Sequence, residues 1–294
     1  MATVLGIGDL ADRAVPPYDC VATVRRAIDA GLNVIDTAPS YEDGYSEQIV
    51  GEALRGRREG MFLIDKIDLL DEAVAPQVEG SLTRLGLGSV DLFVFHAVKE
   101  LDQWRKLTGP DGGFAQLEDC VRAGKTRFRG ISTHHPQVAR TAIESGLCDV
   151  ILFPVGPFCD SRYIDECLPL AKRLGVGAVC FKTFGAGKLL GDTEGYGRPL
   201  ARRPRGKFSS GGVPTGSAPS LPALSVSECV NFTLTCDPDV ALLGLSFPNE
   251  QDEAFAAATT FRRLSEEEMA SVRKRALEAV DGKGPCWWNP DDGP

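Results

Sequence analysis

The sequence lacks the features typical of membrane proteins, of secreted proteins and of proteins stabilised by disulfides or zinc. In 294 residues there is no apolar run near the roughly 18 residues that a membrane-spanning helix needs. The stretch from Met1 to Leu5 shows no basic segment followed by a long apolar one, so no secretory signal peptide is expected. The nine cysteines form no Cys-x-x-Cys pair, which argues against a disulfide framework or a zinc site. We therefore expect a cytoplasmic protein with reduced thiols.

The chain also lacks an excess of basic charge. Its 32 lysines and arginines stand against 41 acidic residues, and the formal net charge is −9. A surface of this sign does not attract nucleic acid or an anionic membrane. We expect neither as a partner.

Short apolar runs, rich in Val, Ile, Leu and Phe, alternate with amphipathic stretches along the whole chain. Such runs are typical of strands buried on both faces. Eight of them predict a (β/α)8 TIM barrel, a fold that often forms one domain at this length. The alternative is an open doubly wound sheet, but Gly6 and Gly8 lead into a polar loop instead of a glycine-rich phosphate turn. The predicted strands are Val4–Gly8, Asn33–Ala38, Phe62–Ile67, Val90–His96, Thr126–Ser132, Val150–Val155, Gly177–Lys182 and Val240–Ser246.

Two segments depart from this regular pattern. Residues 193–222 are dense in Gly, Pro and Ser and carry several basic residues, which predicts a long loop that is either functional, such as a lid over a ligand, or disordered. From about residue 265 a C-terminal helix and tail follow, because Ser265 and Glu268 form a capping box. The predicted organisation is one barrel domain over residues 1–294 with this loop and this tail.

Four reactive side chains fall where three successive predicted strands end. Asp36, Lys66 and His96 lie at the ends of these strands, and Tyr41 follows in the loop after the first of them. Parallel barrel strands end on one face, where barrel enzymes carry their chemistry. Each residue alone has an ordinary structural explanation, such as a lysine whose ammonium reaches solvent. Together they predict a catalytic site.

These residue types suit general acid or base chemistry at an oxygen atom. A phenol titrates near 10, and a lysine cation held by a carboxylate favours the phenolate. Tyr41 is then the general acid or base, assisted by Lys66 and Asp36, while His96 polarises and positions the oxygen. No metal is required for such a proton transfer.

The segment Asp36-Thr37-Ala38-Pro39-Ser40-Tyr41, followed by Gly44, Ser46-Glu47, Gly51 and Ala53-Leu54, resembles the signature of the aldo-keto reductases. In that family the aspartate and tyrosine of this segment belong to a catalytic tetrad, and Lys66 and His96 match its lysine and histidine. The likeness extends from about residue 4 to residue 260. It implies an NAD(P)-dependent oxidoreductase of the EC 1.1.1 type that interconverts a small aldehyde or ketone and an alcohol.

The resemblance also implies a dinucleotide site, with departures. Thr133 replaces an expected Asn, Leu152 and Val155 stand where the family has Gln and Tyr, and no basic residue lies between Gly244 and Arg262. The chain starts almost directly in its first predicted strand, so either the hairpin that plugs the barrel in this family is absent or the true start of the protein lies upstream. We predict NADP(H), with NAD(H) as the alternative and an unusually small margin between them. The predicted cofactor residues are Ser132, Thr133, Val155, Lys182, Phe184, Gly185, Gly187, Lys188, Leu189, Ser246 and Glu253.

Two other functions are compatible with parts of this pattern. A barrel that binds a dinucleotide or a partner protein without turnover is favoured by the altered nicotinamide contacts, but opposed by the intact tetrad. A lyase or isomerase that uses Lys66 as a Schiff-base nucleophile leaves Tyr41 and the loop Gly185–Gly187 without a role.

Overall fold

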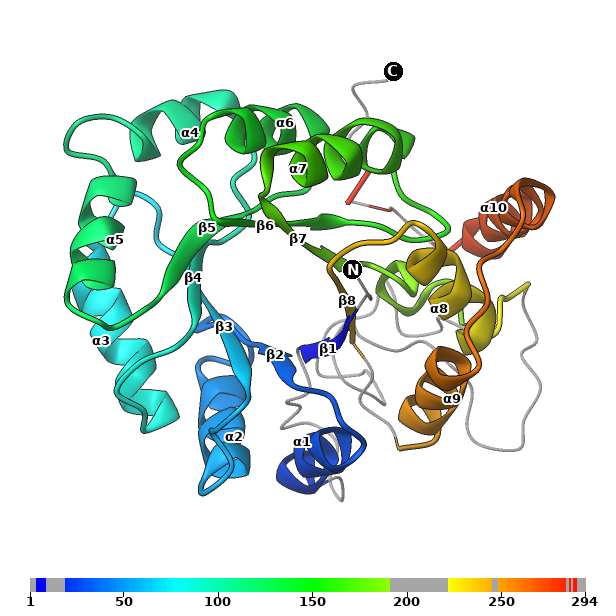
Figure 1. Cartoon of the computed structure of the whole chain (residues 1–294), viewed down its shortest axis with the longest axis horizontal. Coiled ribbons are helices and arrows are strands. Elements are labelled where there is room, and N and C mark those ends of the chain that lie inside the picture. Colours follow the sequence, from blue (N-terminus) through cyan, green and yellow to red (C-terminus); the bar gives the residue numbers. More distant parts are fainter. Residues whose placement is uncertain are drawn as a thin grey trace.

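Eight parallel strands close into a barrel in the computed structural model, each pairing with its neighbours in chain order and β8 pairing with β1 (Figure 1). The structure describes residues 4–8, 19–190, 222–244, 248–283, 286 and 288–289. The predicted (β/α)8 barrel is confirmed, and the open sheet is wrong. The strands are β1 (Val4–Gly8), β2 (Val34–Asp36), β3 (Phe62–Ile67), β4 (Leu92–Phe95), β5 (Phe128–Ser132), β6 (Val150–Pro154), β7 (Gly177–Phe181) and β8 (Val240–Leu243).

Helices follow the strands and surround the barrel (Figure 1). They are α1 (Cys20–Asp29), α2 (Tyr45–Leu54), α3 (Val74–Leu85), α4 (Leu101–Leu107), α5 (Gly113–Arg122), α6 (Pro136–Glu144), α7 (Leu168–Leu174), α8 (Val226–Thr235), α9 (Pro248–Thr259) and α10 (Glu266–Val280). A π-helical turn, η1 (Tyr163–Cys167), precedes α7, and a 3-10 turn, η2 (Gly185–Gly187), follows β7. Among the described residues, no helix has the length and apolar character needed to cross a membrane.

Helix starts follow their capping chemistry. Ser265 and Glu268 form the predicted capping box of α10, in which the Glu268 N–H donates to the Ser265 hydroxyl and the Ser265 N–H donates to Glu268 at 2.8 Å. α3, in contrast, was not predicted. Its N-cap is Ala73, whose side chain caps no backbone N–H, so the sequence carries no start signal there.

Side chains along each strand alternate between the barrel interior and the layer beneath the helices. Val34 and Ile64 belong to the interior cluster, whereas Ile35 and Leu63 belong to the cluster under the helices. Asp36 and Lys66 lie two positions after Val34 and Ile64, respectively. Their side chains therefore face the interior at the carboxyl ends of β2 and β3.

Several strands end earlier than predicted. β2 stops at Asp36 and not at Ala38, and β4 and β7 stop one residue before His96 and Lys182. Positive φ angles at Ala97 (54°) and Lys182 (73°) end the extended backbone there. The barrel mouth is therefore built from loops directly after the strands. The single-domain organisation and the lack of a plugging hairpin stay predictions.

Close approach of β5 and β6 explains one glycine. A Cβ atom at Gly130 would lie 1.7 Å from the carbonyl oxygen of Val150. No side chain fits between these strands, so the register of β5 against β6 requires glycine at this position.

Candidate active site

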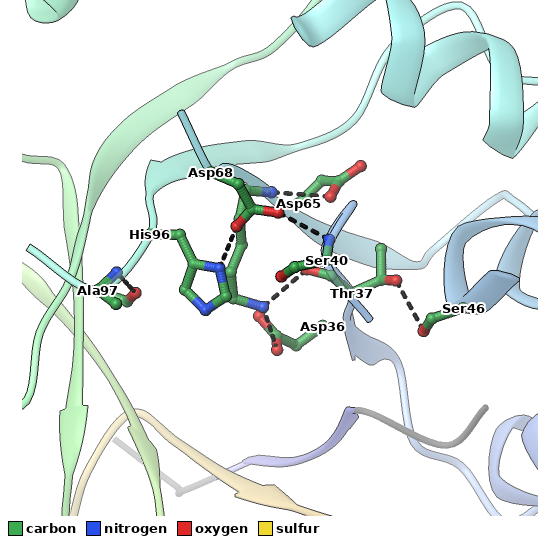
Figure 2. A network of polar contacts seen from close by, with 10 residues as sticks. Asp36, Thr37, Ser40, Ser46, Asp65, Asp68, His96 and Ala97 are labelled. Atoms are coloured by element: carbon green, nitrogen blue, oxygen red, sulfur yellow. Dashed lines mark hydrogen bonds and ion pairs between the residues drawn. The ribbon is translucent and has the colours of Figure 1, made fainter. Parts of the chain in front are cut away.

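The barrel mouth over β2, β3 and β4 gathers the four side chains that the sequence predicted to converge. Asp36 is the last residue of β2, Lys66 is the last residue but one of β3, and His96 directly follows β4. Tyr41 lies in the loop between β2 and α2. Figure 2 shows Asp36 and His96 within the same small group of polar contacts.

Lys66 and Asp36 form a buried ion pair. The Lys66 Nζ atom donates to Asp36 Oδ2 at 2.6 Å and to the carbonyl oxygen of Thr37 at 2.7 Å. The two side chains are only 3% and 6% exposed. Burial works to lower the pKa of Lys66, but Asp36 and Tyr41 outweigh it and raise that pKa above its ordinary value. Lys66 is therefore a cation at the barrel mouth.

Tyr41 lies against both Lys66 and His96. The Lys66 Nζ atom is 4.5 Å from the centroid of the Tyr41 ring. The Tyr41 and His96 rings meet edge to face, with centroids 5.8 Å apart. The loop is held by a hydrogen bond from the Gly44 N–H to the Pro39 carbonyl at 2.7 Å, and Gly44 has a φ of 77°. This tight turn keeps the phenol beside the ammonium.

Asp68 is a functional candidate that the sequence analysis missed. Its carboxylate contacts Nδ1 of His96 and accepts the Ser40 N–H at 2.7 Å (Figure 2). Asp68 follows Lys66 by two residues, so the alternation of a strand directs both side chains to the same face. That spacing is the signal that could have identified it.

A second acidic group lies on the other side of β3. Asp65 is fully buried and accepts the Lys66 N–H at 2.8 Å. Burial raises the pKa of Asp65 well above its ordinary range, and the buried carboxylate of Glu47 adds to this rise. Arg84 binds Glu47 through two nitrogens, one at 3.1 Å. This group lies behind the strand that carries Lys66 and does not open to the barrel mouth.

Ser132 and Thr133 are predicted to bind the cofactor, and both form hydrogen bonds with the loop after β4. The Ala97 N–H donates to the Ser132 hydroxyl at 2.8 Å, and the Thr133 hydroxyl donates to the Val98 carbonyl at 2.6 Å. Both residues are buried. In this structure their hydroxyl groups hold the loop that carries His96.

The mouth over β6 and β7 is apolar and aromatic. Leu152 belongs to the interior cluster, and Val155 is fully buried, with its N–H bonded to the Phe181 carbonyl at 2.8 Å. The His134 ring lies 5.0 Å from the Phe181 ring. Burial, together with the charge of Lys182, holds the pKa of His134 well below its usual range. This side therefore presents a neutral imidazole and a phenyl ring, neither of which the sequence analysis singled out.

The predicted pyrophosphate loop follows β7 and contains η2. Gly185 and Gly187 have φ angles of 53° and 86°, a conformation that glycine adopts without strain. Phe184 and Leu189 are buried beside them. Lys188 is also buried, and its ammonium donates to the Lys283 carbonyl. In this structure Lys188 ties the loop to the C-terminal tail.

The remaining predicted contacts are only partly described. Trp288 of the tail is fully buried, and its indole N–H donates to the Phe158 carbonyl at 2.9 Å. Glu253 is exposed on α9. Ser246 lies outside the described residues, as do residues 193–221 of the predicted lid loop.

The model of the aldo/keto reductase family matches residues 3–275 of this chain. A methylglyoxal reductase of Escherichia coli is 36% identical over 115 residues, which cover 38% of either chain. Dihydrodiol dehydrogenase 3 of Bos taurus is 32% identical over 49% of this chain and 51% of its own. The chain thus spans about half or less of these curated relatives. An uncharacterized oxidoreductase of Bacillus subtilis is 26% identical over 86% of both chains.

Solved structures share the fold over nearly their whole length. An aldo-keto reductase from Bacillus halodurans superposes with a TM-score of 0.68 at 22% identity, covering 92% of this chain and 91% of that one. An aldo-keto reductase from Klebsiella pneumoniae, solved in complex with NADPH, has a TM-score of 0.66 at 22% identity, with 95% and 92% covered.

Proposed function

This chain belongs to the aldo/keto reductase family, and from that premise we propose that it transfers a hydride between a nicotinamide dinucleotide, NADP(H) in preference to NAD(H), and a small carbonyl or alcohol. Tyr41 acts as the general acid or base, with Lys66, Asp36 and His96 assisting it. The Klebsiella pneumoniae neighbour binds NADPH, which supports the choice of cofactor.

The observation that carries this proposal is the position of the Lys66 ammonium. It lies between the Asp36 carboxylate, at 2.6 Å, and the Tyr41 ring, at 4.5 Å from the centroid. A cation beside a phenol stabilises the phenolate, so the phenol gives up its proton more readily. Asp36 keeps the cation in place and balances its charge within a buried pair. Tyr41 can then donate a proton to a carbonyl oxygen, or accept one from an alcohol.

His96 orients the oxygen that exchanges this proton. Its ring is edge-on to Tyr41, at 5.8 Å between centroids, so both polar groups face the same volume at the barrel mouth. A hydrogen bond from the imidazole to the substrate oxygen stabilises the charge that develops there.

The described residues fit the phosphate end of a dinucleotide better than its nicotinamide end. The Thr183 hydroxyl is buried and has no hydrogen-bond partner among the described residues, and Thr183 directly follows Lys182 in the chain. With the backbone of η2 these groups would hold the pyrophosphate. Leu152 and Val155 would leave an apolar wall at the other end. When bound, the nicotinamide supplies or accepts the hydride.

One observation favours the second candidate, a barrel that binds a dinucleotide without turnover. The Ser132 and Thr133 hydroxyls are engaged by Ala97 and Val98, so they hold the nicotinamide less firmly. The Schiff-base alternative is disfavoured, because the raised pKa of Lys66 keeps its nitrogen protonated and an ammonium is no nucleophile.

Absorbance loss from NADPH mixed with a panel of aldehydes tests the proposal. We expect turnover in the wild type and a loss of about 10²–10⁴-fold in Tyr41→Phe, as for removal of a general acid. Cofactor affinity, read from fluorescence quenching, should be nearly unchanged. Tyr45→Phe removes a hydroxyl four residues away and serves as the matched control. Full turnover in Tyr41→Phe would contradict the assignment, and cofactor binding without turnover in the wild type would favour the second candidate.

A further inference from the structure

Asp68 joins two parts of the barrel mouth through one carboxylate. Oδ1 contacts Nδ1 of His96, and Oδ2 accepts the Ser40 N–H at 2.7 Å (Figure 2). Ser40 directly precedes Tyr41 in the chain. The side chains of Asp68 and His96 are 18% and 20% exposed, so neither is in bulk water. Asp68 therefore links the orientation of the histidine ring to the loop of the tyrosine.

A carboxylate at Nδ1 decides where a neutral imidazole keeps its proton. The neutral ring has one N–H donor, and its other nitrogen only accepts. Since a carboxylate only accepts, the proton stays at Nδ1, as for the histidine of a serine-protease triad. In His96 the nitrogen Nε2 then carries a lone pair while the ring is neutral, and an N–H only in the imidazolium.

The charges around His96 make Asp68 its counter-ion. Lys66 and Asp36 neutralise each other, and the ring edge of Tyr41 is uncharged. On the side of β5 and β7, burial and then the charges of Lys182 and His96 act to lower the pKa of His134. Partial burial works to raise the pKa of Asp68, but hydrogen bonds from His96 and Ser40 outweigh it and lower that pKa. Asp68 is thus an anion, and protonation of His96 completes a second ion pair.

We propose that Asp68 is a positioning residue that makes His96 a pH-dependent donor to the substrate oxygen. The imidazolium donates from Nε2 to a carbonyl oxygen, whereas the neutral ring presents only a lone pair to that oxygen. His96 thus assists reduction while its ring carries both protons, and in alcohol oxidation the single hydroxyl proton goes to Tyr41. This inference rests on the proposed carbonyl chemistry.

Nitrogen NMR of the ¹⁵N-labelled protein tests the proton position without any turnover. The chain has three histidines, and the His96 signals are assigned by their loss in His96→Gln. In the neutral form of the wild type we expect the proton on Nδ1. In Asp68→Asn the side-chain amide oxygen should still accept the hydrogen bond from the Ser40 N–H. The amide NH₂ group then faces Nδ1 of His96, so the proton of the neutral ring should move to Nε2. A wild-type neutral ring with its proton on Nε2 would overturn the inference.

The pH profile of kcat/KM for aldehyde reduction tests the consequence. In the wild type we expect kcat/KM to fall to a lower plateau as the pH rises, by no more than the roughly 10²–10⁴-fold that one acid–base group contributes, because the neutral ring offers the carbonyl oxygen no N–H. Asp68→Asn should be slower at low pH and flat through this range, because its neutral ring donates from Nε2. Asp71→Asn removes an exposed charge three residues away and should keep the wild-type slope.

The outcomes separate this inference from the proposed function. Turnover that depends on Tyr41, with the same slope in Asp68→Asn as in the wild type, overturns the role of Asp68 and leaves the reductase assignment standing. A wild type that reduces no carbonyl overturns the proposed function itself.

Discussion

Replacing Lys66 by methionine removes one partner of a buried ion pair and keeps most of the side-chain volume. The Asp36 carboxylate is then buried without the cation that now lies 2.6 Å away. Breaking a buried pair in this way costs about 3–5 kcal/mol. At roughly 2–4 °C per kcal/mol for a large domain, Tm should fall by about 6–20 °C. Reduction should be lost as well, because the phenolate of Tyr41 is no longer stabilised.

The stability loss in Lys66→Met should depend on pH. In the wild type the pKa of Lys66 lies above its ordinary value of 10.5, so the stability that the cation contributes is fully present below 10.5 and is lost only as the pH rises above it. In the variant an unpaired buried carboxylate prefers its neutral form, and the native state therefore binds a proton that the unfolded state releases above about pH 4. The free energy of unfolding of the variant should then decrease as the pH rises toward 7, by at most about 1.4 kcal/mol per pH unit.

Urea unfolding at acidic and neutral pH measures this difference, with two comparisons. Asp36→Asn combined with Lys66→Met removes the orphan charge and should recover part of the loss. Lys172→Met breaks an ion pair with Asp237 whose partners are 40% and 36% exposed, and should cost no more than about 1 kcal/mol. A Lys66→Met protein within about 1 kcal/mol of the wild type at neutral pH would refute the reasoning, as would a double variant that recovers nothing.

Three further predictions concern other parts of the chain. The pKa of buried Asp65 is raised, so the native protein loses stability as the pH rises above the ordinary value of 3.8. Asp65→Asn should therefore raise Tm at pH 7 and flatten the dependence of Tm on pH. An unchanged Tm profile would contradict the interaction of the buried Asp65 and Glu47 carboxyl groups. Gly130→Ala should lower the free energy of unfolding in urea by about 1–3 kcal/mol or more. Gly88→Ala is the control and should be neutral, because no atom lies within 4 Å of its added Cβ. Equal stability of the two variants would show that β5 and β6 can separate enough to admit a side chain. Fluorescence titration should show NADPH bound only slightly more tightly than NADH, and a preference above about a thousandfold, or roughly 4 kcal/mol, would mean that a phosphate-binding group lies outside the stretch from Gly244 to Arg262.

The sequence by itself determined the barrel and the convergence of its four reactive side chains. Each of the eight buried strands appears in the sequence as a continuous apolar run, because parallel strands are covered on both faces. Since parallel strands all end on one face, residues at three successive strand ends had to meet there. Asp36, Lys66 and His96 could be placed together by this topological argument without knowing any distance.

Only the tertiary structure decided which polar groups bind one another. Asp68 could be placed on the face of Lys66 by strand alternation, but its contacts with His96 and Ser40 depend on how two loops approach in space. The same holds for Lys188, which the sequence placed at a phosphate and the structure ties to Lys283. Periodicity records which face a residue occupies. A hydrogen bond depends on a few tenths of an ångström and on direction, and these are set by the packing of distant segments that the local pattern does not contain.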